Sequence, residues 1–173
     1  MIRKFIEKAR SVETVVKVIP KLPGAINETL HTIIKDDKKI VISDFKFVND
    51  ELLREFKKNN SNIIVNPPDE ELAKAKYGIT DSFAGIAETA SVCLLNDNSM
   101  TGSFSLFTEV HIAFLNAEDI VPRPRNIFLD EPFKSITEKE DFIIVSGSSA
   151  TADMGTLVRG VHGPAKLYVV ILN

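Results

Sequence analysis

The chain has 173 residues, with 21 Lys and Arg against 24 Asp and Glu, so its formal net charge is −3. That balance argues against a protein that binds nucleic acid through bulk positive charge. Apolar residues make up 44% of the chain and charged residues 26%. This composition excludes disorder as the main state and indicates a single globular domain over residues 1–173.

The single cysteine limits the chemistry. With only Cys93, one chain forms no internal disulfide and no zinc or iron–sulfur site made of cysteines alone. We therefore expect a reducing, cytoplasmic setting and a buried, inert thiol. No apolar run is long enough for a membrane span. The charged residues 1–8 lack the apolar stretch of a signal peptide.

The first part of the chain alternates between helix and strand patterns. Apolar residues at helical spacing predict a helix over residues 2–12. A β-branched run before Pro20 favours a strand over 14–19. The alternation continues with a helix over 26–34, a buried strand over 39–43, a helix capped by Asn49, a strand over 62–65 and a helix over 69–75.

Four further apolar runs predict strands at 91–95, 110–115, 142–145 and 167–172. The polar residues 96–99 supply a turn, so the first two of these strands are expected to form an antiparallel hairpin. Strands separated by helices indicate an α/β fold, a three-layer α/β/α domain with a mostly parallel sheet. We expect the C-terminal strand close to the centre of that sheet.

Residues 146–153, Ser-Gly-Ser-Ser-Ala-Thr-Ala-Asp, form the first candidate site. Ligands of open α/β sheets bind beyond the carboxyl ends of the strands, and this segment follows the predicted strand 142–145. Gly147 lets the backbone approach an anion, and the hydroxyls of Ser148, Ser149 and Thr151 add donors. Asp153 would orient the loop. The alternative is a Ser-rich loop that only caps a helix.

The second candidate is Arg159-Gly160-Val161-His162-Gly163-Pro164. The glycines Gly160 and Gly163 bracket His162, which is suited to act as an acid, a base or a ligand near neutral pH. The alternative is a structural histidine at the entry to the last strand. Arg159 would bind a carboxylate ligand or pair with Asp153, and of the two the pairing within the protein is favoured. We expect His162 and Arg159 to face one pocket.

The third candidate is Glu88, surrounded by small residues in the segment 78–90. It would serve as a nucleophile or base, or it would merely cap backbone N–H groups. His111, in an apolar strand, is interpreted as a core or edge residue, and His31 as a surface residue. Because the three histidines lie far apart in sequence, no metal site is predicted.

Together these segments resemble the lactate-utilisation LutC/YkgG family, the LUD domain. The family pattern Gly-Pro-Ser-x-Thr-Ala-Asp is similar to residues 147–153, with Ser148 in place of the usual Pro. The family's Leu-Val-x-Gly-Val-His-Gly-Pro is similar to 157–164, its Ile-Ala-Glu-Thr to 86–89 and its Val-His-Ile to 110–112.

The resemblance implies a fold like that of the NagB/RpiA/CoA-transferase group. It also implies a role in oxidising L-lactate to pyruvate, in a subunit without its own cofactor that works beside iron–sulfur partner proteins. The first hypothesis is therefore a LutC-like subunit that binds a small anion, a carboxylate or a phosphate. The alternatives are a stand-alone CoA-transferase-like or phosphosugar- or folate-type enzyme that uses Glu88, and a non-catalytic interaction module, with a homo-oligomer as one form of it.

Overall fold

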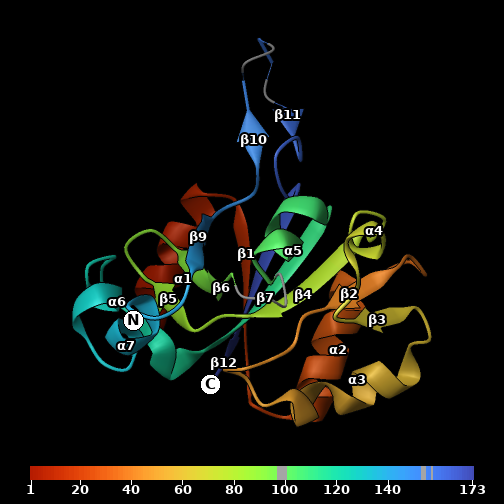
Figure 1. The fold of residues 1–173 in the computed structure, drawn as a ribbon, viewed down its shortest axis with the longest axis horizontal. Helices are drawn as coiled ribbons and strands as arrows, with labels where there is room; N and C mark the ends of the chain where they lie inside the picture. Colours follow the sequence, from red (N-terminus) through yellow and green to blue (C-terminus); the bar gives the residue numbers. More distant parts are fainter. Residues whose placement is uncertain (97–100, 153–154, 157) are drawn as a thin grey trace.

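The structure is a computed structural model, and it describes residues 1–96, 101–152, 155–156 and 158–173. Six strands form one sheet in the order β1-β12-β7-β4-β2-β3, and every neighbouring pair is parallel (Figure 1). The strands are β1 Thr14–Ile19, β2 Ile40–Ile42, β3 Ile63–Val65, β4 Tyr77–Asp81, β7 Val110–Asn116 and β12 Lys166–Leu172. The predicted α/β fold with a mostly parallel sheet is confirmed.

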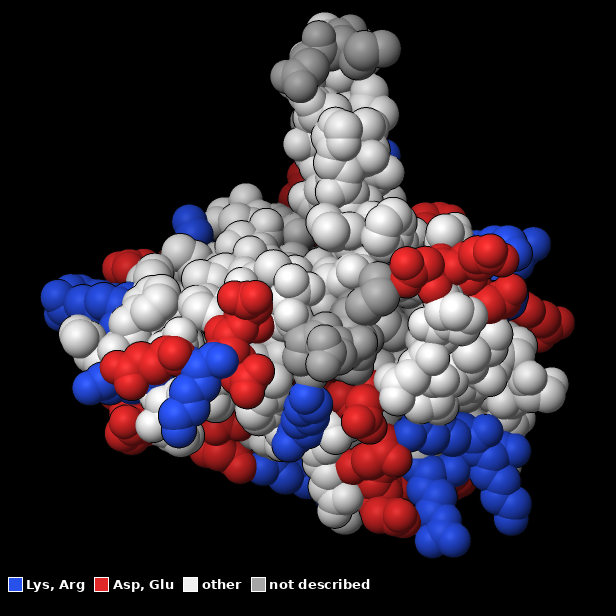
Figure 2. Space-filling model, viewed as in Figure 1, with Lys and Arg blue, Asp and Glu red and all other residues white. Residues whose placement is uncertain are grey.

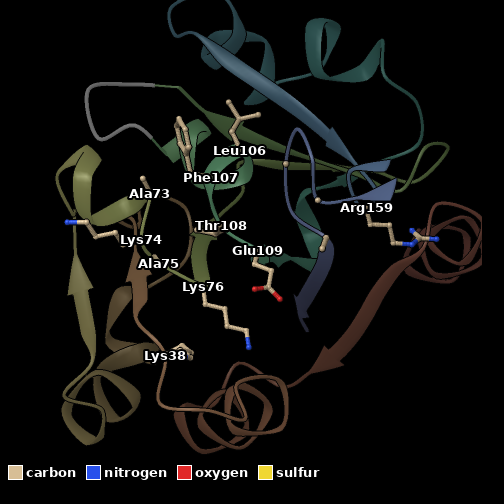
Figure 3. Close-up of a pocket in the computed structure, with 13 residues that line it drawn as sticks. Lys38, Ala73, Lys74, Ala75, Lys76, Leu106, Phe107, Thr108, Glu109 and Arg159 are labelled. Carbon is tan, nitrogen blue, oxygen red and sulfur yellow. The ribbon is translucent and has the colours of Figure 1, made fainter. Parts of the chain in front are cut away.

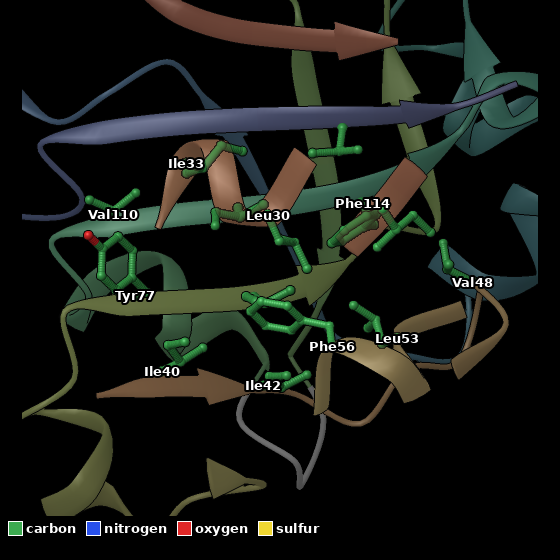
Figure 4. Packing of buried hydrophobic residues seen from close by; sticks show 14 of the residues in the cluster. Leu30, Ile33, Ile40, Ile42, Val48, Leu53, Phe56, Tyr77, Val110 and Phe114 are labelled. Carbon is green, nitrogen blue, oxygen red and sulfur yellow. The ribbon is translucent and has the colours of Figure 1, made fainter. Parts of the chain in front are cut away.

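Helices cover both faces of this sheet. On one face lie α2 Pro23–Ile33, the 3-10 helix η1 Asp50–Leu53 and α3 Arg54–Asn59. Figure 4 shows Leu30 and Phe56 of these helices packed against Ile42 and Phe114 of the strands. On the other face lie α1 Ile2–Ser11, α4 Asp69–Leu72 and α5 Thr101–Phe107. Strands buried on both faces carry nearly continuous apolar runs, as 112–115 in β7 and 169–172 in β12 do.

A smaller sheet of four strands, in the order β8-β5-β6-β9, packs beside the first. Its strands are β5 Ala84–Ile86, β6 Ser91–Leu95, β8 Ile120–Val121 (preceded by the 3-10 helix η2 Ala117–Asp119) and β9 Phe142–Ser146. Val92 and Leu94 of β6 join the core around α1. Cys93, on the opposite side of β6, packs with residues of α6 Asn126–Leu129 and α7 Phe133–Thr137.

The second sheet overturns the hairpin prediction. The strands predicted at 91–95 and 110–115 are present as β6 and β7, but they belong to different sheets, and α5 lies between them in the chain. Residues 97–99 of the predicted turn lie outside the described residues. β6 pairs antiparallel with β5 and β9. An apolar run can pair with several others, and here 91–95 pairs with β5, just before it in the chain, and with the distant β9.

A two-stranded ribbon, β10 Ala150–Thr151 and β11 Val158–Arg159, projects from the body (Figure 1). The chain runs from β9 into this ribbon and from the ribbon into β12. The ribbon therefore stands at the edge where β12 begins, which is the amino edge of the parallel sheet. The predicted position of residues 146–153 at the carboxyl edge of the main sheet is wrong, because β9 belongs to the smaller sheet.

Most other predicted elements are present with small shifts. Asn49 caps η1, with its side-chain oxygen accepting from the Glu51 amide at 3.1 Å. β12 lies inside the main sheet between β1 and β7, whereas β7 and β4 occupy its middle. β4 was not predicted, because the sequence Tyr77–Asp81 interrupts its apolar residues with Gly, Thr and Asp. In the described part of the chain, no helix combines the length and the apolar character of a membrane span.

Candidate functional site

The base of the ribbon consists of residues 146–149 on the way out and 160–164 on the way back. Gly147 adopts a φ of +77°, and a Cβ atom there would lie 2.4 Å from the backbone oxygen of Val12. Only glycine readily adopts this φ and has no Cβ to clash with Val12. The packing of this segment against the end of α1 therefore requires glycine at position 147. Gly147 was predicted to let the backbone approach a bound anion. In the structure its backbone closely approaches Val12 of the same chain.

Ser149 joins the two sides of the ribbon base. Its backbone N–H donates to the Pro164 carbonyl at 2.8 Å, and its carbonyl accepts from the Gly160 N–H at 3.1 Å. Its hydroxyl accepts from the His162 backbone N–H at 3.3 Å. The segments around Ser149 and His162, predicted separately from the sequence, are therefore one local structure.

Three hollows surround this base. The largest, about 660 Å³, runs along the amino ends of β2, β4, β7 and β12, and we call it the amino-edge cavity (Figure 3). Gly160 and Gly163 line it, and Arg159 lies at its rim. A second, of about 310 Å³, lies between β9 and the residues 162–164, and we call it the β9 hollow. The third, also about 310 Å³, lies beside β1.

Four of the predicted site residues line the β9 hollow: the ligand residues Gly147, Ser149 and Gly163, and the candidate acid or base His162. Its walls are otherwise largely apolar, with Ile143 and Leu106 among them. The His162 side chain is exposed. Small hollows with an apolar wall and a few hydroxyl and imidazole groups suit small ligands that carry both polar and apolar groups.

Arg159 does not share the β9 hollow. Its guanidinium forms an ion pair with Glu13, which follows α1, and donates weakly to the Ser148 hydroxyl at 3.4 Å. Arg159 and Ser148 line the third hollow together with Glu13. The expectation that His162 and Arg159 face one pocket is wrong, because the pairing with Glu13 draws the guanidinium toward β1. Arg159 thus pairs within the protein, but with Glu13; its predicted partner, Asp153, lies outside the described residues.

One of the predicted ligand residues, Thr151, stands higher on the ribbon. Thr151 is half-buried in β10, where it pairs with Val158 of β11. Asp153 lies outside the described residues. Figure 2 shows the projecting ribbon as mostly uncharged, whereas Lys, Arg, Asp and Glu are spread over the body below it.

Glu88 lies on the exposed turn between β5 and β6. Its carboxylate is 3.8 Å from the Arg123 guanidinium, and its backbone N–H donates to the Pro122 carbonyl at 3.2 Å. Next to it, the hydroxyls of Thr89 and Ser91 lie 2.6 Å apart. The Glu88 segment therefore lies close to the ribbon base, since Ser91 also contacts Ser146. None of the three hollows contains Glu88.

Sequence reasoning missed this chain of hydroxyls. The Ser91 and Ser146 oxygens lie 2.5 Å apart, and the two residues are direct partners in the antiparallel pairing of β6 with β9. Glu13 and Arg123, which neutralise Arg159 and Glu88, were missed as well. No local pattern marks them, because each acts through a partner far away in sequence.

His111 is fully buried in β7, as the core interpretation predicted. Its Nε2 lies 2.9 Å from the Thr80 hydroxyl of β4, and its Nδ1 is without a hydrogen-bond partner among the described residues. Burial lowers the pKa of His111 to about 4. The ring is therefore neutral at physiological pH. In the described ranges, no group of three or more His, Cys, Asp or Glu side chains is placed to hold a metal ion.

Comparison with known proteins identifies the family. The family model for the LUD domain matches residues 2–172, nearly the whole chain. This chain belongs to the LUD domain family. The family resemblance carried by residues 86–89, 110–112 and 147–164 is thereby confirmed.

Several relatives of this LUD domain carry a functional name. "Lactate utilization protein C" of Oceanobacillus iheyensis is 34% identical over 104 residues, covering 58% of this chain and 45% of that protein. "Lactate utilization protein C 1" of Bacillus mycoides is 35% identical over 115 residues, covering 61% and 47%. The protein of Bacillus subtilis is 31% identical over 104 residues, covering 58% and 43%. The LUD domain thus matches less than half the length of these relatives.

A solved structure has the same fold. The crystal structure of a DUF162 family protein from Deinococcus radiodurans superimposes with a TM-score of 0.67, covering 99% of this chain and 96% of that one. The sequence identity is 18%, so this likeness bears on the fold alone.

Proposed function

We propose that this LUD domain acts in lactate utilisation as a LutC-like protein and contributes to the oxidation of L-lactate to pyruvate. The observation that carries the proposal is the match of its sequence to proteins named lactate utilization protein C, within a family that spans nearly the whole chain. In this role it works beside iron–sulfur proteins that carry the electrons, and it needs no cofactor of its own.

The β9 hollow is the place proposed for a small carboxylate. The Ser149 hydroxyl and the His162 imidazole are donors suited to a carboxylate or a hydroxyl group. Ile143 and Leu106 offer an apolar wall for a methyl group. A short 2-hydroxy acid such as lactate combines these groups. Gly163 and Gly147 shape the backbone around the hollow.

Binding is tested first, by thermal shift and calorimetry with L-lactate, D-lactate, pyruvate and inorganic phosphate. A ligand at 100 times its Kd adds about 2.7 kcal/mol to stability. For a chain of this size, that raises Tm by roughly 5–10 °C. His162→Ala should weaken L-lactate binding about tenfold or more, as expected for the loss of a charge-assisted hydrogen bond.

His31→Ala is the matched control, because His31 is an exposed histidine on α2, outside the β9 hollow. Binding of L-lactate that is equally strong in His162→Ala and His31→Ala would refute the site. No binding of any of the four compounds would leave the family role to be tested by co-purification with iron–sulfur proteins from lactate-grown cells. Failure of that co-purification would refute the role.

A further inference from the structure

The amino-edge cavity is larger than a small carboxylate requires. Its volume of about 660 Å³ lies in the range of pockets that hold ligands of drug or cofactor size, roughly 300–1,000 Å³. A neighbouring hollow of about 260 Å³ shares Lys76 and Glu109 with it. The two hollows border each other at Lys76 and Glu109 along the amino ends of the parallel strands, and we call this pair of hollows the amino-edge groove.

Basic residues dominate this groove although the whole chain has a net charge of −3. The cations that line it are Lys35, Lys38, Lys74, Lys76, Lys166 and Arg159, and the acids are Asp36 and Glu109. They come from the segment before β2, the segment before β4, the ribbon and the first residue of β12. The folded sheet therefore gathers cations that are scattered along the sequence.

Some of these cations already have partners. Lys76 is 2.5 Å from Asp36, Lys74 is 3.6 Å from Glu71, and Arg159 pairs with Glu13. Lys35, Lys38 and Lys166 are different. Within the described ranges, no carboxylate lies within ion-pair distance of these three lysines. They are free to bind an anion that enters the groove.

Apolar and aromatic side chains lie among the lysines. Leu106 and Phe107, at the end of α5, are 57% and 56% exposed although both are large and apolar (Figure 3). The half-buried Tyr168 and the buried Tyr77 line the smaller hollow. Lysines bind phosphate groups as point charges, and exposed aromatic rings stack on planar groups.

We infer that the amino-edge groove binds a ligand that joins a pyrophosphate to a planar aromatic group of nucleobase size. Lys38 of the larger hollow and Lys166 of the smaller one would bind the phosphates where the two hollows meet. Phe107 of the larger hollow or Tyr168 of the smaller one would contact the planar group. The inference goes beyond the proposed function, because the groove and the β9 hollow are separate and share only the wall formed by Leu106 and Gly163.

Calorimetry with inorganic pyrophosphate and with ADP tests this site at low ionic strength. Both should bind, and ADP should bind about tenfold more tightly because its base adds a stacking contact. Lys38→Ala and Lys166→Ala should each weaken ADP binding about tenfold or more. Glu109→Gln should tighten it a few-fold, since the glutamate repels an anion in the groove.

Lys58→Ala is the matched control, because Lys58 is an exposed lysine on α3 that does not line the groove. It should leave ADP binding unchanged. The inference is overturned if neither compound binds, if ADP binds no more tightly than pyrophosphate, or if Lys58→Ala weakens binding as much as Lys38→Ala. L-lactate binding should be the same in Lys38→Ala and the wild type, so the two sites succeed or fail independently.

Discussion

The buried histidine of β7 should make the stability of this protein sensitive to mild acid. His111 is fully buried, and burial lowers its pKa from the ordinary 6.5 to about 4. The ring has a normal pKa in the unfolded chain, so protons favour the unfolded state. The contribution of His111 to stability is therefore fully present above pH 6.5 and is lost as the pH falls from 6.5 to 4.

The size of the effect follows from the shift. Each unit of pKa difference between the folded and unfolded states corresponds to about 1.4 kcal/mol of stability. Complete loss of the His111 contribution would therefore lower the free energy of unfolding by about 3 kcal/mol. Between pH 7 and pH 5 the same relation gives a loss of about 2 kcal/mol. That is a large part of the stability of a typical domain, about 5–15 kcal/mol.

Urea unfolding at pH 7 and pH 5 measures this loss in the wild type and in His111→Gln. Glutamine does not titrate, so the variant should lose about 2 kcal/mol less between the two pH values. Other groups titrate alike in both proteins and cancel, among them Asp81, whose pKa is raised by burial. His31→Gln, which changes an exposed histidine, should behave as the wild type does. Equal pH dependence in the wild type and His111→Gln would refute the reasoning.

Three further predictions concern the fold. The Asp81 carboxylate accepts hydrogen bonds from three backbone N–H groups of residues 46–48, so Asp81→Ala should lower the free energy of unfolding in urea by about 3 kcal/mol. Asp81→Asn retains an acceptor oxygen and should lower it by less than about 1 kcal/mol. Similar losses in the two variants would count against the hydrogen bonds as the cause. Burial raises the pKa of the Cys93 thiol to about 12. Ellman's reagent should therefore label Cys93 only after the protein is unfolded in urea. Fast labelling of the native protein would contradict the burial of this thiol. Gly147→Ala should destabilise the protein by about 2 kcal/mol or more, because the added Cβ would clash with the backbone oxygen of Val12. Gly155 also has a positive φ but has open space around it, so Gly155→Ala should cost only about 1 kcal/mol of stability. Equal decreases of Tm in the two variants would refute the role of the contact with Val12.

Local patterns in the sequence determined much of the secondary structure. The apolar periodicity of residues 2–12 specifies a helix, and the β-branched run at 14–19 specifies a strand. Each pattern is local, because side chains return to the same face about every 3.6 residues in a helix and every two residues in a strand. The family could be recognised from short segments such as 160–164. These features need no knowledge of distant contacts.

Only the tertiary structure decided how those elements combine. The strand at 91–95 could pair with any exposed strand edge, and its place in a second sheet depended on β5 and β9. That choice moved the Gly147 segment from the expected carboxyl edge to the amino edge of the main sheet, beside the start of β12.

The same limit applied to the candidate site. Sequence singled out Ser149 and His162, which do meet, but it gave no sign that Arg159 would turn toward Glu13 or that Ser91 would contact Ser146. Pairing of side chains depends on distances in space, and residues far apart in the chain acquire such distances only when the sheets have formed. The amino-edge groove is likewise a product of parallel strands that begin at one edge.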